Sequence, residues 1–398
     1  MLHVHSSNRL ENLLSGLLDQ INNGDPFLAE VIVVQNPGMS RWLSQQIAER
    51  QGISANLEFV TPANFFWRAA QCWFDDLTEH PSRNKVRLQW QIFQLLPDFL
   101  SQSAFEQLAV YLRGDEDTLQ RFQLSGAIAN TFDQYLIYRP DLIERWQQGK
   151  DVHWQALLWR AIAKDEPALS WGDIRTRFAA AQKQSPVKPM PACVSVFGIS
   201  DLAPLYLDLL QIIAGHTKTT LYYLNPCVEY WADIKDEKSL ARRRARAYKL
   251  HNSDTDPTGL LDIVNPLLAS WGHAGQSFLD QLLERQVQET EDYSAPGKET
   301  LLRCLQGDIL HLEDKTDGSG GTIAADDHSV QIHSVHSTLR EVQVLHDQLL
   351  NLFASRDNLE PRDIIVMAPD IDCYAPFVDA VFGTAPSRQY IPLSLIHI

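Results

Sequence analysis

The stretch LHVHSSNRLENLLSGLLDQI (Leu2–Ile21) decides how the beginning of the chain folds. Residues Leu2–His5 predict a short strand, and the polar residues Ser6–Asn8 predict a tight turn. Apolar residues then recur at steps of three and four, which is typical of an amphipathic helix with one buried face. Those apolar positions are Leu10, Leu13, Leu14, Leu17, Leu18 and Ile21.

A nucleotide-driven motor begins with the same order of strand, loop and helix, but this loop lacks the motor's phosphate-binding residues. A phosphate-binding loop needs glycines that free backbone N–H groups, and a lysine that balances the phosphate charge. The turn Ser6–Asn8 contains neither residue type, and the 398-residue chain contains no GxxxxGK[ST] motif. We therefore expect no ATP hydrolysis at this position.

The alternation of strand and helix continues beyond this opening. The run VIVVQ (31–35) is typical of a strand buried on both faces, and a helix is predicted over Ser40–Arg50. A second strand follows within NLEFVTP (56–62), and a helix follows within ANFFWRAAQCWF (63–74). This order predicts a parallel sheet with right-handed crossovers.

In the rest of the chain, the predicted secondary structure changes three times. Between about residues 68 and 178 the β-branched runs give way to helical periodicity, and strands return at Val194–Gly198 and Thr220–Leu224. An acidic, glycine-containing stretch, EDKTDGSGGTIAADD (313–327), predicts a linker, and two strand-then-helix patterns follow it. The predicted divisions are a first α/β domain (1–75 and 190–312), an all-helical insertion (76–189), a linker (313–328), the start of a second α/β domain (329–392) and a tail (393–398).

The charge, hydropathy and cysteine content of the chain argue against several classes of protein. The net charge of −16 argues against a surface that coats nucleic acid throughout, although a local basic channel stays compatible with it. No apolar run reaches the ~18 residues that a membrane span needs, and the first residues do not resemble a secretion signal. The five cysteines form no CxxC pair, so we expect a reducing, cytoplasmic environment.

Metal chemistry has weak support in the sequence. Asp370 and Asp372 follow a predicted strand, but the ExK element of a metal nuclease does not come after them. His3 and His5 share one face of a strand without a recognisable third ligand. We interpret these four residues as ordinary polar positions and expect neither a metal site nor a cofactor in this chain.

The only dense positive cluster supports two interpretations. It consists of Arg242, Arg243, Arg244 and Arg246, and the acidic stretch DIKDEK precedes it. The cluster is either a solvated helix that pairs with its own acidic residues or a helix that contacts phosphates.

A second candidate interface lies where the first strands end. Arg41 and Trp42 follow one strand-end turn and Trp67 follows the next strand, which is where open α/β sheets form a ligand crevice. An arginine and aromatic residues suit a single nucleic-acid strand, which binds through stacking and charge. The segment FDQYLIYRP (132–140) adds polar residues that either read base edges or cap a helix.

Several blocks of sequence together resemble the RecC family, the gamma subunit of bacterial exodeoxyribonuclease V (RecBCD). They include HSSNRLENLL, VQNPGMSRWL, FQLSGAIANTFDQYLIYRP, NPLLASWGHAGQSF and PRDIIVMAPDIDCYAPFVDAVFG. The resemblance implies a superfamily 1 helicase-like (RecA-like) fold whose ATP-binding and catalytic motifs have decayed. It also implies a non-catalytic subunit that partners RecB and RecD in a heterotrimer, while those partners use ATP and Mg²⁺. Such a subunit helps to split duplex DNA and scans one strand for the Chi octamer during double-strand break repair by homologous recombination.

The resemblance also carries over individual residues of the Chi-reading surface. The positions that fit the family pattern are Gln35, Trp67, Asp133, Gln134 and Arg139. The positions that are equivalent but differ in residue type are Pro37, Arg41, Thr61, Asn130 and Thr131. Since proline removes a donor and arginine adds charge, the resemblance predicts a variant octamer or a weaker response.

Two departures from the family qualify this expectation. Members of the family are far longer than 398 residues, and LSLIHI (393–398) does not continue the family pattern, so we expect a fragment with a non-native tail. Two alternative functions also stay open at this point. One is an ATP-hydrolysing helicase–nuclease subunit, and the other is a scaffold that only docks the partner subunits.

Overall fold

The computed structural model of the chain describes residues 1–22, 27–77, 85–112, 118–165, 174, 177–178, 180–181, 184–234, 265–285, 287–315, 318–387 and 389–394. These residues divide into two compact units. Unit 1 comprises Met1–Pro296 and Leu305–Gly320, and unit 2 comprises Gly297–Cys304 and Gly321–Ile398.

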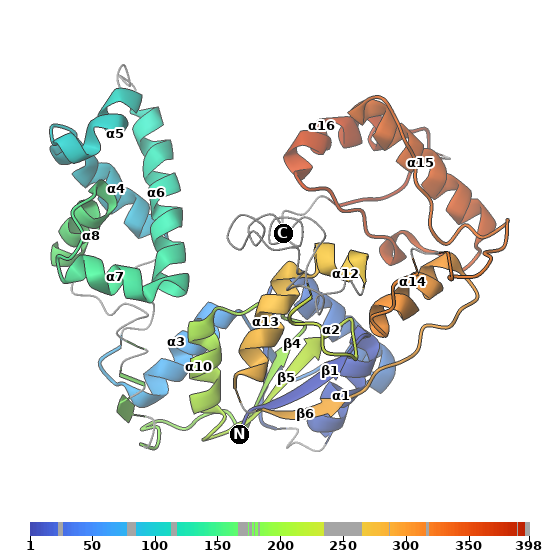
Figure 1. Ribbon diagram of the computed structural model, residues 1–398, viewed down its shortest axis with the longest axis horizontal. Helices are drawn as coiled ribbons and strands as arrows, with labels where there is room; N and C mark the ends of the chain where they lie inside the picture. Colours follow the sequence, from blue (N-terminus) through green and yellow to red (C-terminus); the bar gives the residue numbers. More distant parts are fainter. Residues whose placement is uncertain are drawn as a thin grey trace, which may run out of the picture. The chain divides into compact units, whose positions relative to one another are not determined.

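Unit 1 is built on one six-stranded sheet in which every neighbouring pair is parallel (Figure 1). The order is β3-β2-β4-β5-β1-β6, and the register places Val4 opposite Leu221 and Ile32 opposite Ser195. The strands are β1 (His3–Ser7), β2 (Glu30–Val33), β3 (Leu57–Val60), β4 (Cys193–Phe197), β5 (Lys218–Leu224) and β6 (Gln288–Glu291). The predicted α/β fold with a parallel sheet is confirmed, and its helicase-like character stays a prediction.

Helices α1 (Leu10–Asn22) and α2 (Pro37–Gln51) cover one face of the sheet. Leucines of α1 and α2 pack with Ile32, Phe197 and Tyr222, which point from the strands toward this face. The helix α2 begins earlier than predicted because Pro37 occupies its first position and Asn36 caps it.

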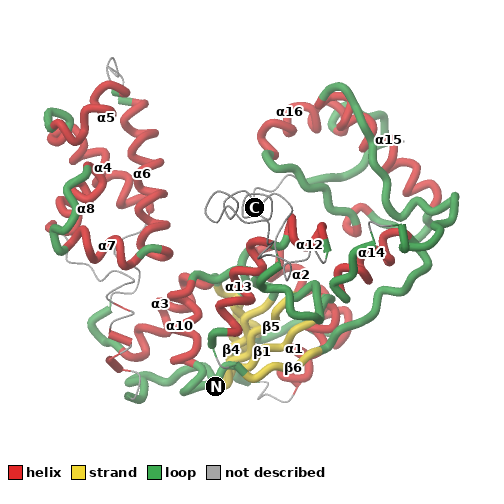
Figure 2. Tube along the Cα trace, viewed as in Figure 1, coloured by secondary structure: helices red, strands yellow, loops and turns green. Residues whose placement is uncertain are grey.

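Helices α3 (Pro62–Trp73), α10 (Pro204–Ile213) and α13 (His273–Leu283) contribute to the core on the other face. The strands send Val33 and Val196 toward this face, so successive residues of one strand serve opposite layers. Figure 2 shows the yellow strands with red helices around them. The predicted burial of the β-branched run of β2 on both faces is therefore confirmed.

Five described helices that follow α3 have a core of their own. They are α4 (Lys85–Phe99), α5 (Glu106–Tyr111), α6 (Leu119–Tyr138), α7 (Pro140–Gln147) and α8 (Trp154–Asp165), with a 3₁₀ turn η1 (Ser103–Phe105). Phe132, Trp146 and Trp159 are fully buried at the centre of this helical group. The prediction of helices in this part of the chain is correct, whereas the domain boundaries at 76 and 189 stay predictions. Across the described ranges, no helix combines the length and apolar character needed to cross a membrane.

Strand β6 was missed by the sequence-based reasoning. All four of its residues, QETE, are exposed, and it pairs only with β1 at the edge of the sheet. An exposed edge strand has no hydrophobic alternation, so the sequence pattern predicts no strand here. Helices α12 (Pro266–Trp271) and α13 precede β6 along the chain, and α14 (Leu301–Leu310) follows it.

Unit 2 contains the two predicted helices but not the two predicted strands. Helices α15 (Thr338–Ser355) and α16 (Ile371–Phe382) pack through Val342, Leu349 and Phe382, and η2 (Pro361–Asp363) lies between them. Among the described residues of 329–392 no strand forms, so the two predicted strands are absent there, and the start of a second α/β domain stays a prediction. A strand needs a hydrogen-bonded neighbour, and the side chains of Ile332 and Met367 in these segments are exposed to solvent.

Candidate nucleic-acid interface

The turn after β1 is closed by hydrogen bonds from a distant part of the chain. The Asn8 side-chain amide donates to the Ser294 carbonyl at 2.9 Å, and the Ser294 amide donates back to Asn8 Oδ1 at 3.0 Å. The Asn12 amide donates to Ser294 Oγ at 2.9 Å and to the Asp292 carbonyl at 3.0 Å. The segment Asp292–Ser294 therefore lies against the beginning of α1, where a phosphate-binding loop would hold its ligand.

The two serines of this turn also have internal partners. The Ser6 hydroxyl donates to Glu289 Oε1 at 2.6 Å, and Ser7 Oγ accepts the Arg9 amide at 3.1 Å. The Ser7 carbonyl accepts the Asn225 amide at 2.9 Å. Since these groups bond within the chain and a carboxylate is among the partners, the turn is poorly suited to bind an anionic phosphate.

Asn225 extends this closed network into a buried aromatic layer. Its side-chain amide Nδ2 donates to the Tyr293 hydroxyl at 2.8 Å, and its side-chain Oδ1 accepts the Trp231 indole N–H at 2.9 Å. Burial and, to a smaller extent, the charge of Glu289 raise the pKa of Tyr293. The phenol is therefore neutral and acts as an internal hydrogen-bonding group. No local pattern indicates that residue 293 meets residue 225, because the contact depends on the edge strand β6.

The turn after β2 is open by contrast. Gln35, Pro37 and Arg41 are exposed at the beginning of α2. Asn36 is committed to the cap, since its Oδ1 accepts the Met39 amide at 3.0 Å. Three of the predicted interface residues are thus accessible on this turn, at the carboxyl edge of the sheet.

The two predicted residues of α3 have different surroundings. Thr61 is exposed at the N-cap position, and its carbonyl accepts the Phe65 amide at 2.9 Å. Trp67 is only 5% exposed and belongs to the core that α3 shares with the sheet. The predicted contact of Trp67 with DNA stays a prediction, and in this structure the indole of Trp67 packs toward the sheet.

The predicted residues of α6 fall on exposed and half-buried positions. Asn130 and Gln134 are exposed, whereas Asp133 is half-buried and Thr131 donates its hydroxyl to the Ala127 carbonyl at 3.0 Å. Burial raises the pKa of the Asp133 carboxyl, and the nearby Lys85 ammonium opposes that rise. Asn130 and Gln134 are consequently the members of this set best placed to reach a ligand.

Arg139 ends α6 and is also accessible. Its side chain lies 3.5 Å from the Asp141 carboxylate, and both side chains are more than half exposed. An exposed pair of this kind contributes little to stability, so the guanidinium is available for a phosphate.

Tyr206 of α10 connects α6 with α3. Its ring stacks on Phe66 with centroids 4.6 Å apart and an interplanar angle of 6°. Burial raises the pKa of Tyr206, and the charges of Asp133 and Tyr138 add to that rise, which places the phenol close to α6. Helix α10 therefore joins α3 and α6 by contacting both. The α2 residues are not joined in this way, since α2 packs on the opposite face of the sheet.

The remaining predicted sites give less support for an interface or a metal site. The basic run at Arg242, Arg243, Arg244 and Arg246 lies outside the described residues. Asp370 caps α16 by accepting the Asp372 amide at 3.1 Å, which agrees with a polar capping position. Within the described part of the chain, no three histidine, cysteine or acidic residues gather in a metal-binding arrangement.

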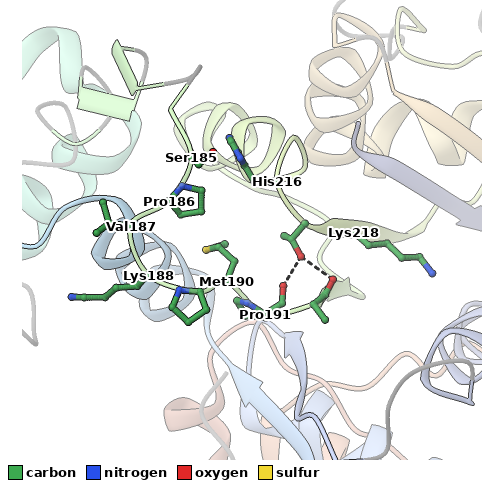
Figure 3. Close-up of a pocket in the computed structure, with 11 residues that line it drawn as sticks. Ser185, Pro186, Val187, Lys188, Met190, Pro191, His216 and Lys218 are labelled. Carbon is green, nitrogen blue, oxygen red and sulfur yellow. Dashed lines mark hydrogen bonds between the residues drawn. The ribbon is translucent and has the colours of Figure 1, made fainter.

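A pocket of about 530 Å³ lies at the opposite, amino-terminal end of β4 and β5. It is lined by residues 185–192 and 216–218, and Thr217 Oγ1 donates to the carbonyls of Pro191 and Ala192 at 2.5 and 2.9 Å (Figure 3). The side chains of Lys188 and Lys218 point away from each other. The pocket contains none of the predicted interface residues and gathers no charge toward its centre.

Comparison with known proteins identifies the family. The family model described as "RecC, N-terminal domain" matches residues 2–312. The RecBCD enzyme subunit RecC of Escherichia coli (strain K12) is 36% identical over 99% of this chain and 39% of its own length. The corresponding subunit of Haemophilus influenzae is 35% identical over 99% of this chain and 40% of its own length, and that of Mycolicibacterium smegmatis is 30% identical over 96% and 34%.

The chain thus spans about two-fifths of the length of the first two of these curated relatives. The match to the family model covers both the sheet and the helices between β3 and β4. By this match and by its identity to the subunits above, the chain belongs to the RecC family.

Proposed function

We propose that this chain is the N-terminal part of a non-catalytic DNA-binding subunit in a heterotrimeric, ATP-dependent helicase and exonuclease. In this proposal RecB and RecD are the partner subunits and supply the ATP and Mg²⁺ chemistry. The subunit helps to split duplex ends during double-strand break repair by homologous recombination in the cytoplasm, and it scans one DNA strand for a Chi sequence.

The closed turn after β1 is the observation that carries the non-catalytic part of this proposal. Asn8, Asn12 and Ser294 bond to one another where a motor would hold a triphosphate. A nucleotide would have to displace these bonds and approach the Glu289 carboxylate, which hydrogen bonds to Ser6.

The exposed polar residues support the scanning part of the proposal. Gln35 on the α2 turn and Asn130 and Gln134 on α6 present amides, which suit the edges of bases, and Arg139 presents a guanidinium for phosphate. Pro37 and Arg41 change the donors of the α2 turn, so we propose that the octamer read by this subunit differs from that of the family's best-known member, or that the response is weaker.

The experiment that tests the proposal assembles the full chain with RecB and RecD and maps cleavage on DNA that carries randomised octamers. We expect one octamer to be enriched at the sites where cleavage changes, and Gln134→Ala to weaken that enrichment while ATP turnover is retained. Unchanged enrichment in Asn130→Ala, Gln134→Ala and Arg139→Ala together would instead favour a scaffold that only docks its partners. DNA-dependent ATP turnover by the pure chain, abolished by changes at Ser7 and Asn8, would favour an ATP-hydrolysing subunit.

A further inference from the structure

An exposed aromatic residue lies on the helical group beside α6. Trp90 of α4 is 49% exposed, although it packs against two phenylalanines. Its ring centroid lies 5.7 Å from that of Phe93, in a T-shaped arrangement, and 5.2 Å from that of Phe122 on α6. One part of the indole is therefore fixed in place while the rest faces solvent.

The contact between α4 and α6 fixes the backbone next to this ring and the two phenylalanines that pack against it. The Gln89 side-chain amide donates to the Phe122 carbonyl at 3.1 Å, and Gly126 allows close approach, since a Cβ there would lie 2.9 Å from Gln89 Nε2. The Arg121 guanidinium lies 4.1 Å from the centre of the Phe93 ring. A rigid aromatic group loses little conformational entropy when a ligand stacks on it.

The exposed side of α6 continues from this ring to the proposed DNA-contacting residues. The exposed residues Leu119, Gln123, Asn130 and Gln134 recur at steps that place them on one stripe of the helix. The other flank of the α4–α6 contact is buried, through Ser125 and Ala129, so the exposed part of Trp90 lies on the side of this stripe. Eight residues of helix, about 12 Å, separate Phe122 from Asn130.

The charge of this surface suits a polyanion, unlike that of the chain as a whole. Helix α6 contains one carboxylate, Asp133, which is half-buried, and α4 contains one, Asp98, near its end. The cations of the two helices are Lys85, Arg87 and Arg121, in a chain whose net charge is −16. Amide side chains and Trp90 supply part of the remaining exposed surface, together with aliphatic residues such as Val86 and Leu119. Cations, amides and an aromatic ring are the groups that single-stranded nucleic acid binds.

We propose that Trp90 is a stacking platform for a base of single-stranded DNA on the surface formed by α4 and α6. This inference rests on the proposed function, because Asn130 and Gln134 of the same surface would contact the neighbouring nucleotides. It assigns to Trp90 the stacking role that the sequence pattern had suggested for Trp67.

The test measures binding of a fluorescein-labelled oligothymidylate to the full chain carrying Trp90→Ala, Trp90→Leu or Trp90→Phe. We expect Ala and Leu to weaken binding by about 5- to 100-fold, because one stacked base is lost, and Phe to retain most of the affinity. Trp271→Ala is the matched control, since Trp271 is 81% exposed on α12 and lies outside this surface. Thermal unfolding of each variant separates lost binding from lost structure.

Three results would overturn the inference. Trp90→Leu could bind as tightly as the unmodified chain, or Trp90→Ala and Trp271→Ala could weaken binding equally. Alternatively, Trp90→Ala could impair assembly with RecB or RecD while oligonucleotide binding stays unchanged, which would make this surface a protein interface. If the Trp90 variants retain binding and Asn130→Ala or Gln134→Ala loses it, only the stacking role fails; if all of them retain it, the proposed DNA surface fails as well.

Discussion

The turn after β1 and the surface formed by α4 and α6 differ in how their polar groups are used. At the turn, Asn8 and Ser294 satisfy each other, and Glu289 adds a negative charge. On the helical surface, Asn130 and Gln134 are exposed beside a half-exposed Trp90. The chain thus closes its first turn with its own side chains, whereas the surface formed by α4 and α6 keeps exposed groups that a ligand can reach.

The largest expected effect is a loss of stability when the buried Trp67 is replaced, compared with replacement of the exposed Trp90. Trp67→Ala should lower the free energy of unfolding by about 3–5 kcal/mol, because it leaves a large cavity between α3 and the sheet. Urea denaturation measures this loss, and Trp90→Ala is the comparison. Native-like stability in Trp67→Ala together with weakened oligonucleotide binding would mean that Trp67 contacts DNA after all.

The next effect probes the closure of the first turn. Asn8→Ala removes the pair of hydrogen bonds to Ser294, and we expect the free energy of unfolding to fall by about 1–3 kcal/mol. Ser40→Ala, which removes one exposed hydrogen bond to the Pro37 carbonyl, is the control and should change little. Equilibrium dialysis with ATP should detect no binding to either variant or to the unmodified chain, and binding by the unmodified chain would contradict a closed turn.

A smaller effect is expected at the end of α6. Arg139→Ala should leave the free energy of unfolding within about 0.5 kcal/mol, since its ion pair with Asp141 is exposed. If the guanidinium contacts one phosphate, the slope of log affinity against log salt should become shallower by ~0.7. Lys150→Ala removes the same charge from an exposed position after α7, and an equal change of slope in that variant would show only a general loss of charge.

The smallest effect concerns His5, on the strand that precedes the closed turn. Burial lowers the pKa of His5 below 6.5, and His3 adds to this, while Asp292 and Asp19 oppose it. The unfolded chain therefore binds more protons below about pH 6.5, and the free energy of unfolding should fall as the pH falls through that range. Denaturation about one pH unit on either side of 6.5 should show a weaker dependence in His5→Gln. An unchanged dependence would assign the effect to other groups, His3 among them.

Local sequence determined several elements of the fold. The β-branched run of β2 and the leucine stripe of α1 each specify an element through propensity and periodicity, and the structure confirms both. Helix α2 is confirmed as well, although it begins at Pro37 and not at the predicted Ser40. The turn Ser6–Asn8 contains neither glycine nor lysine, and these residue types alone argue against a phosphate-binding loop at this position.

Only the tertiary structure decided the elements that depend on distant partners. Strand β6 exists because β1 offers it hydrogen bonds, and the segments near Ile332 and Met367 form no strand among the described residues because none pairs with them. The residues of the proposed interface were predicted in part, since Gln35, Asn130, Gln134 and Arg139 are accessible.

The same dependence explains why the sequence did not show which tryptophan is exposed. Sequence reports that a tryptophan is present near the end of a strand, but burial is set by which face of the helix meets the sheet and by what packs above it. Trp67 faces the core through α3, whereas Trp90 lies at the edge of a helix pair, and no local pattern distinguishes them. Sequence by itself thus determined several helices and strands and the lack of glycine and lysine in the first turn. Tertiary packing decided which side chains a ligand can reach, because the exposure of a side chain depends on neighbours that are distant along the chain.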